Sequence, residues 1–433
     1  MKNINEFKKH VGTLISGNVL AQAITFAASP VLTRLYSPEE FGFYATFVSL
    51  VSVLSVLFAL TFEKCIPLAI NRKIAGQITV LSLKLAACFS VFYIVVVTTT
   101  SFSLLKMFTG RTSLWLEIIL ILSVFSASAT QTLNFWHLRE QYFASTSRAK
   151  VSQNLGNVFS QALFSQFDAL RSSGLIIGDA FGRLAAFSMQ YMSFIRLKQV
   201  KGIFKTKIWS AYIWKKYYRF PLFTSISVLF NALSLQIPIL ALNQFFNASI
   251  AGNFMLTQKV IGIPITLIGT AVAQVFYSTA AKSIDSNPIQ VLVLYKKITR
   301  NLFFVTLPVF VVFSFIAPFV FQAFFGKGWF LSGQYFQILA VSFFSQLIVL
   351  PVSQVLYITH NQIVQTIWDF SRFACFYLIF LSCHFFQIGE LSTIGIYTIF
   401  STSFYLLLYL LGRYYISTQV QQHARKRSML NRN

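Results

Sequence analysis

Long apolar stretches separated by short polar segments form the pattern of this chain from one end to the other. An apolar stretch of about 20 residues, as a helix, is long enough to cross roughly 30 Å of hydrocarbon. On that criterion the sequence predicts about twelve membrane-spanning helices, six on each side of a basic segment at residues 196–219. Those before the segment are expected at about 11–33, 41–62, 78–105, 114–136, 151–168 and 174–195. Those after it are expected at about 220–242, 252–276, 301–324, 332–357, 364–386 and 392–415.

This pattern predicts an all-α polytopic membrane protein with two six-helix bundles around a central cavity. Two halves that start on the same side of the membrane would be parallel repeats. A faint echo between residues 33–44 and 243–254 agrees with that relation. The predicted divisions are bundle 1–195, basic cytoplasmic connector 196–219, bundle 220–416 and basic cytoplasmic tail 417–433. The sixth span carries Gly174, Gly178 and Gly182 at four-residue spacing, which predicts close approach of another helix.

The charges support a membrane location and fix an expected orientation. Charged residues make up 11% of the chain and hydrophobic residues 56%, whereas about a quarter of an average soluble protein is charged. The net charge of +24 comes largely from basic residues that flank apolar runs, so it indicates a membrane protein and not a nucleic-acid partner. Residues 196–219 hold eight basic residues and no acid. A cytoplasmic N-terminus places 26 of the 35 Lys and Arg residues inside, which predicts a multi-pass inner-membrane protein with both termini cytoplasmic.

Basic side chains inside the predicted spans are candidate substrate ligands. Each would cost about 2.5–3.5 kcal/mol at the bilayer centre, so they are expected to face a polar interior. The candidate cavity cations are Lys259, Arg183, Arg34, Arg372 and Lys84. Lys259 is preferred because its own span holds no acid. Lys84 lies near the inner end of its span, where it is also able to snorkel, and Arg34, at the outer end of the first span, is also placed to meet headgroups.

Three acids are candidates for ion or proton coupling: Glu63, Asp179 and Asp369. Burial raises the pKa of a carboxyl group, which allows it to bind and release a proton near neutral pH. The alternative is a structural ion pair, because Asp179 precedes Arg183 by four residues and Asp369 precedes Arg372 by three. The histidines are scattered without metal-ligand spacing, and no pattern indicates catalytic residues or a cofactor.

Three segments of the sequence carry recognisable motifs. The first is PVLTRLYSPEEFG at residues 30–42, and the second runs from Lys259 to Phe276. The third is Trp368-Asp369-Phe370. Together they resemble a known family, the bacterial polysaccharide and O-antigen repeat-unit flippases of the multidrug/oligosaccharidyl-lipid/polysaccharide exporter (MOP) superfamily. The segment Phe62-Glu63-Lys64-Cys65 departs from the family pattern, because relatives often have an Arg before the aromatic–Glu pair.

The resemblance implies an alternating-access flippase, not an enzyme. Its substrate would be an undecaprenyl-diphosphate-linked oligosaccharide for O-antigen, lipopolysaccharide or capsule, moved from the inner to the outer leaflet. Membrane lipids and a polysaccharide polymerase are the other expected partners, and Lys259 stands where relatives often carry Arg or Lys. One alternative is a drug/cation antiporter of the same superfamily. Another is a membrane glycan polymerase or glycosyltransferase, which the short outer loops disfavour.

Overall fold

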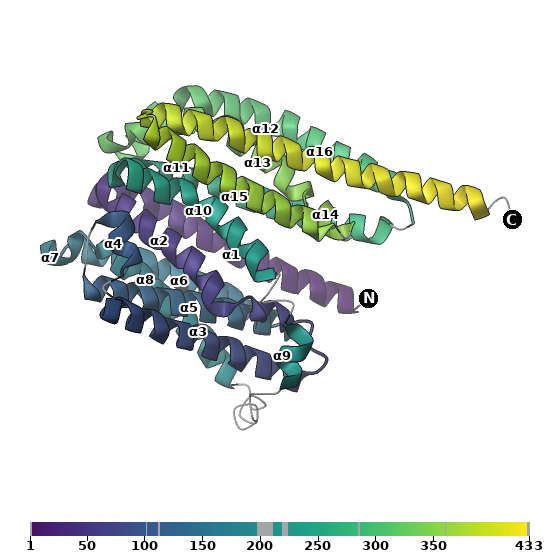
Figure 1. Cartoon of the computed structure of the whole chain (residues 1–433), viewed down its shortest axis with the longest axis horizontal. Helices are drawn as coiled ribbons and strands as arrows, with labels where there is room; N and C mark the ends of the chain where they lie inside the picture. Colours follow the sequence, from purple (N-terminus) through teal and green to yellow (C-terminus); the bar gives the residue numbers. More distant parts are fainter. Residues whose placement is uncertain are drawn as a thin grey trace. The chain divides into compact units, whose positions relative to one another are not determined.

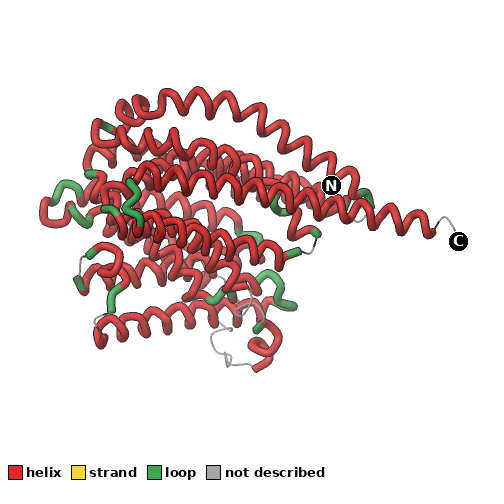
Figure 2. The backbone as a smooth tube through the Cα atoms, turned by 45° about the horizontal axis from the view of Figure 1, so that its top comes forward, coloured by secondary structure: helices red, strands yellow, loops and turns green. Residues whose placement is uncertain are grey.

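The structure, a computed structural model, describes residues 2–100, 102–110, 113–196, 211–218, 224–284, 286–359 and 361–430. These residues form helices joined by short loops, with no strand among them (Figure 2). Most of the predicted connector, 197–210 together with residue 219, and the last three residues of the predicted tail lie outside the described residues.

Twelve helices of 20 residues or more are described, and each overlaps one of the twelve predicted spans. The first six are α1 (Lys2–Leu35), α2 (Pro38–Ala59), α3 (Arg72–Thr100), α5 (Leu114–Arg139), α6 (Phe143–Phe164) and α8 (Gly174–Arg196). The other six are α10 (Ser225–Phe245), α11 (Ala248–Ser283), α12 (Pro288–Phe325), α13 (Phe330–Val349), α15 (Gln362–Phe385) and α16 (Glu390–Leu430). Short helices join them: η1 (Phe62–Cys65), α4 (Leu104–Thr109), α7 (Asp168–Arg171), α9 (Ala211–Tyr217), η4 (Lys327–Trp329), η5 (Leu350–Val352) and α14 (Val355–Ile358).

Nine helical segments of the described chain are long and apolar enough to cross a membrane. The remaining long helices, α1, α6 and α8, carry more polar residues and pack on one another. Their polar groups bond across the helices. Lys150 Nζ donates to Asn18 Oδ1 (2.8 Å), and the Asn154 amide donates to the carbonyl oxygen of Ala21 (2.5 Å). Because internal bonds satisfy these groups, polar helices are compatible with a membrane interior, and the predicted all-α fold with about twelve transmembrane helices is confirmed.

Contacts divide the chain into an N-terminal unit, Met1–Gly252, and a C-terminal unit, Asn253–Asn433. In the N-terminal unit α10 packs against α2 and α4, so the seventh predicted span lies with the first six. The bundle limits at 195 and 220 stay a prediction from the sequence. Within this unit α4 and α7 lie at one end and α9 at the other (Figure 1).

The start of α2 follows from its sequence. The Ser37 hydroxyl accepts from the Glu40 amide (3.3 Å), and the Glu40 carboxylate accepts from the Ser37 amide (2.7 Å). This capping box satisfies two of the donors that a helix N-terminus leaves without partners. Pro38 occupies the first turn, where its missing N–H is not needed. The expected capping role of the acid pair is confirmed for Glu40.

Glycines allow two close helix contacts in the N-terminal unit. A Cβ atom added to Gly178 or Gly182 of α8 would collide with α6 at Gln161 or Asn157, respectively. The close packing predicted from the glycine spacing is therefore confirmed.

The second contact joins the starts of α2 and α11. A Cβ on Gly42 would collide with the backbone of Ala248, and one on Gly252 with the backbone of Pro38. Gly42 and Gly252 occupy equivalent places in the sequence echo, so the contact is reciprocal.

The C-terminal unit has its own apolar core, in which α12 and α16 meet around Tyr295. The Tyr295 hydroxyl donates to the carbonyl oxygen of Tyr409 (2.9 Å), and Gly412 leaves room for its ring. On the outside of α12, apolar side chains repeat every three or four residues and are exposed: Val305, Val309, Val312, Ile316 and Phe319. Such a stripe is suited to contact with lipid.

Candidate functional site

An ion pair with a buried carboxylate lies in the first half of α8. Arg183 Nε donates to Asp179 Oδ2 at 2.5 Å, and the Asp179 side chain is only 3% exposed. The other carboxylate oxygen accepts from the Tyr44 hydroxyl of α2 and from the Asn157 amide of α6, each at 3.3 Å. The pairing allowed by the four-residue spacing is thus confirmed. Three helices satisfy the carboxylate, as a buried charge requires.

Arg183 also lines a polar cavity of about 320 Å³ inside the N-terminal unit. The other lining residues come from α2, α5 and α6, and most are hydroxyl or amide side chains: Ser52, Ser55, Val56, Ala127, Thr130, Gln131, Asn134 and Gln153. Of these lining residues Arg183 alone carries a charge. The cavity therefore offers many neutral donors and acceptors, together with one guanidinium whose charge Asp179 balances.

Glu63 is connected to this cavity through Gln131. The Gln131 amide donates to Glu63 Oε1 at 3.4 Å, while Glu63 Oε2 is buried without a hydrogen-bond partner. Glu63 lies in η1, and the two residues before that element, Leu60 and Thr61, have left-handed backbone conformations with φ of 47° and 51°. Such conformations are unfavourable for residues other than glycine. They turn the chain sharply after α2, and Glu63 follows them as a buried residue.

Burial controls the protonation of Glu63. The side chain is 1% exposed, and burial raises the pKa of its carboxyl group to about 7. A backbone hydrogen bond at Glu63, the neighbouring ammonium group of Lys64 and the bond from Gln131 oppose this rise in pKa without cancelling it. Glu63 is therefore able to exchange a proton near neutral pH.

A second buried ion pair lies in α15 of the C-terminal unit. Arg372 Nη2 is 3.6 Å from Asp369 Oδ1, and the guanidinium lies over the Trp368 ring at 4.4 Å from its centroid. Trp368 Nε1 in turn donates to the carbonyl oxygen of Phe404 (3.0 Å). Arg372 thus forms the intrahelical pair that its spacing allows, with an added cation–π contact.

Lys259 lies on α11 and is half-buried. Helical spacing puts Gly262, Thr266 and Thr270 on the same face. A Cβ atom on Gly262 would meet nothing within 4 Å, and both threonines are exposed. Lys259 therefore shares a small, hydroxyl-bearing face of the helix with open space beside it.

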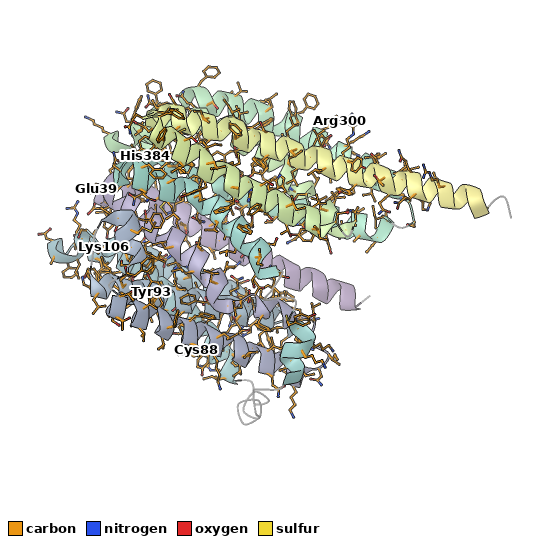
Figure 3. All side chains as sticks on the ribbon, in the orientation of Figure 1. Glu39, Cys88, Tyr93, Lys106, Arg300 and His384 are labelled. Atoms are coloured by element: carbon orange, nitrogen blue, oxygen red, sulfur yellow. The ribbon has the colours of Figure 1, made fainter. Side chains whose placement is uncertain are left out.

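The remaining candidates lie apart from these groups. Arg34, in the last turn of α1, and Lys84, on α3, are both exposed. Lys84 shares its face of α3 with the exposed residues Cys88, Val91 and Val95; Figure 3 shows Cys88 on that helix. Within the described residues no three His, Cys, Asp or Glu side chains are grouped as a metal site.

Sequence reasoning missed the neutral residues of the site. Tyr44 and Asn157 bond to Asp179, and Gln131 links Glu63 to the cavity. A signal for the lining was present in α5, where polar residues recur at helical spacing within an apolar run, at Thr130, Gln131 and Asn134. No such signal pairs residues that come from different helices.

The fold is that of MOP-superfamily transporters. An inward-facing multidrug resistance MATE family transporter of that superfamily matches with a TM-score of 0.71 and 16% identity, over 92% of this chain and 96% of that one. A MOP superfamily transporter from Pyrococcus furiosus, described as having a binding pocket of reversed polarity, matches with a TM-score of 0.64 and 15% identity, over 95% of this chain and 96% of that one. The lipid II flippase MurJ matches with a TM-score of 0.67 and 13% identity, over 94% of this chain and 87% of that one.

A sequence profile of one family, described as "Polysaccharide biosynthesis protein", matches residues 31–333. The chain belongs to this family. The match contains most of the first motif and all of the second, so the resemblance to polysaccharide flippases is confirmed at the level of family and fold. No curated protein matches the chain significantly.

Proposed function

We propose that the protein is a flippase for an undecaprenyl-diphosphate-linked oligosaccharide, an O-antigen or capsular repeat unit. It moves this lipid by alternating access from the inner to the outer leaflet of the cytoplasmic membrane and performs no covalent chemistry. The observation that carries the proposal is the family match over residues 31–333 on a transporter fold. At the coarser level, the chain is a multi-pass membrane protein of a polysaccharide biosynthesis family.

The cargo requires a polar route and a means to balance its charge. A diphosphate and several sugars are too polar to enter hydrocarbon without hydrogen-bond partners. We propose Lys259 as a ligand of the diphosphate, because charge-assisted bonds to phosphate are the stronger kind. Arg183, whose charge Asp179 balances, is proposed as a hydrogen-bond donor to the cargo in the polar cavity of the N-terminal unit. A negative cell interior assists the outward movement of an anion by about 2.3 kcal/mol per charge for each 100 mV.

The arrangement of the N-terminal unit supports the proposed orientation. Helix α9 carries the exposed residues Lys215 and Lys216, and it packs through Ile213 and Tyr217 against the core around η1. At the same end Arg72 pairs with Glu140 (2.7 Å). We propose that this basic end faces the cytoplasm, as positive charge at short loops favours.

Membrane lipids are proposed partners at a groove on the same unit. It has a volume of about 970 Å³ and runs along α6 between α1 and α8. Leu20, Leu155 and Phe159 line it, and all three are exposed. A groove of this composition favours hydrocarbon chains over sugars.

A drug/cation antiporter is the second candidate, because several similar structures are multidrug transporters. A cation carrier is expected to present uncompensated acids to its cargo. Here Asp179, the partner of the cavity residue Arg183, is bonded to Arg183, Tyr44 and Asn157. Asp179 is therefore not available to a cationic cargo, which disfavours the antiporter.

Deletion of the gene tests the proposal. Undecaprenyl-linked glycan should accumulate on the inner face of the membrane, and the wild-type gene should restore export. Normal delivery of glycan to the outer leaflet, together with altered dye resistance, would replace the flippase with the antiporter.

A further inference from the structure

A second polar pocket, of about 490 Å³, lies in the N-terminal unit at the end opposite α9. It is formed by the first turns of α2, by α4 and by the junction of α10 and α11. Figure 3 shows Glu39 and Lys106, two of its lining residues, at this end of the unit. None of the candidate residues considered above lines it.

One wall of this pocket is held by a buried carboxylate. The Ser103 hydroxyl caps α4 by accepting from the Lys106 amide (2.8 Å), and it donates to Glu117. Glu117 is 5% exposed, and its other oxygen accepts from the Tyr93 hydroxyl (3.1 Å). Gly110 ends the helix with φ of 67°. Helix α4, only six residues long, is thereby fixed in position.

The opposite wall is tied to the first. The Asn243 amide at the end of α10 donates to the carbonyl oxygen of Phe108 (2.6 Å). Asn247 caps α11 by accepting from the Ile250 amide (3.0 Å). A pocket whose walls are bonded to each other binds without first having to become ordered.

The lining defines the chemistry of the ligand. Glu39 and Lys106 contribute one charge of each sign, while the Gln244 amide joins those of Asn243 and Asn247. These groups both donate and accept hydrogen bonds and carry no net charge. The rings of Phe43 and Phe108 add apolar surface. A diphosphate would require an excess of cations, whereas a polyhydroxylated, uncharged ring matches both the amides and the aromatic surfaces.

We propose that this pocket is a carbohydrate-binding site that receives a sugar of the transported oligosaccharide. Its volume is near the lower end of the range for ligand pockets, roughly 300–1,000 Å³, so it suits one or two sugar residues and not a whole repeat unit. That the bound sugar belongs to the transported oligosaccharide rests on the proposed function. In the proposed orientation the pocket faces outward, where holding the sugars would oppose their return to the inner leaflet.

Binding of free sugars tests the site separately from transport. The probe is the oligosaccharide released by mild acid from the host strain's undecaprenyl carrier. Saturation-transfer NMR on the full chain in nanodiscs gives its Kd. Gln244→Ala should raise the Kd about threefold to tenfold, the usual effect of losing one hydrogen bond, and Lys106→Gln should raise it at least as much. Gln244→Trp, which fills the pocket, should abolish binding.

The matched control is Gln166→Ala. Gln166 is an exposed glutamine outside the pocket, and its amide bonds to the neighbouring Ser165. It should leave the Kd unchanged. Equal Kd values in all variants, or no binding to the wild type, would overturn the site. If binding does not depend on the pocket but the wild type translocates lipid-linked oligosaccharide in vesicles, only the proposed sugar site is wrong. If binding depends on the pocket but the wild type does not translocate the lipid, the sugar site stands and the proposed flippase function is wrong.

Discussion

Replacing Glu63 with Gln keeps the shape of the side chain and removes its titration. The wild-type carboxyl group is buried, has one oxygen without a hydrogen-bond partner and has a pKa raised by burial from 4.5 to about 7. Below about pH 4.5 the group is protonated in both the folded and the unfolded chain. As the pH rises toward 7 the unfolded chain releases its proton first, so the folded state loses stability. Above pH 7 the whole penalty is present.

The size of the penalty follows from the shift in pKa. A rise of about 2.5 units at 1.36 kcal/mol per unit amounts to roughly 3 kcal/mol. Glu63→Gln should therefore be more stable than the wild type by about that amount at pH 8 and by almost nothing at pH 4.5. With an unfolding entropy of about 2.1 cal/mol/K per residue, the difference at pH 8 corresponds to roughly 3 °C in Tm.

Thermal unfolding of the purified proteins between pH 4.5 and 8 measures the difference in stability between Glu63→Gln and the wild type. Infrared titration gives the pKa of Glu63 directly, from the carboxyl band that the wild type has and the variant lacks. Gln166→Ala, which changes an exposed residue that does not titrate, is the control and should leave the stability unchanged at every pH. If Glu63 carries a coupled proton, the change in transport rate near pH 7 should disappear in Glu63→Gln. A band that titrates near pH 4.5, or a stability difference independent of pH, would show that burial does not raise the pKa of Glu63.

Three further outcomes are expected. Lys259→Ala should abolish glycan export while the protein stays in the membrane, whereas Lys297→Ala, which changes an exposed lysine outside the candidate residues, should export normally; surface glycan assays with membrane immunoblots decide, and full export by Lys259→Ala would remove it from the site. Asp179→Asn should lower the stability by about 3–5 kcal/mol, because Arg183 becomes a buried charge without its partner, and exchanging the two residues should restore part of it; denaturant unfolding that leaves Asp179→Asn at wild-type stability would contradict the pair. Gly42→Leu should lower Tm, because its side chain meets the backbone of Ala248; an unchanged Tm would contradict the close contact.

The sequence predicted the helices well because most of the spans are long and strongly apolar. It also predicted the pairing of Asp179 with Arg183, since residues four apart on a helix always share a face. Even α6 was recognised as a span, although residues such as Asn154 and Asn157 make it polar.

Contacts between distant helices were beyond prediction from the sequence. The hydroxyl of Tyr44 reaches Asp179 only because α2 packs near α8, which no local pattern encodes. The burial of Glu63 follows the left-handed turn at Leu60 and Thr61. Neither residue type favours that conformation, so the turn left no signal.

The most direct test of the flippase is transport by the purified protein in vesicles. Proteoliposomes would contain a labelled undecaprenyl-diphosphate oligosaccharide, and a membrane-impermeant glycosidase added outside would report the fraction that has crossed. For a flippase we expect the digested fraction to rise well above that of protein-free vesicles and to fall back to that level with Lys259→Ala. A wild-type protein that leaves the digested fraction at the protein-free level would contradict it.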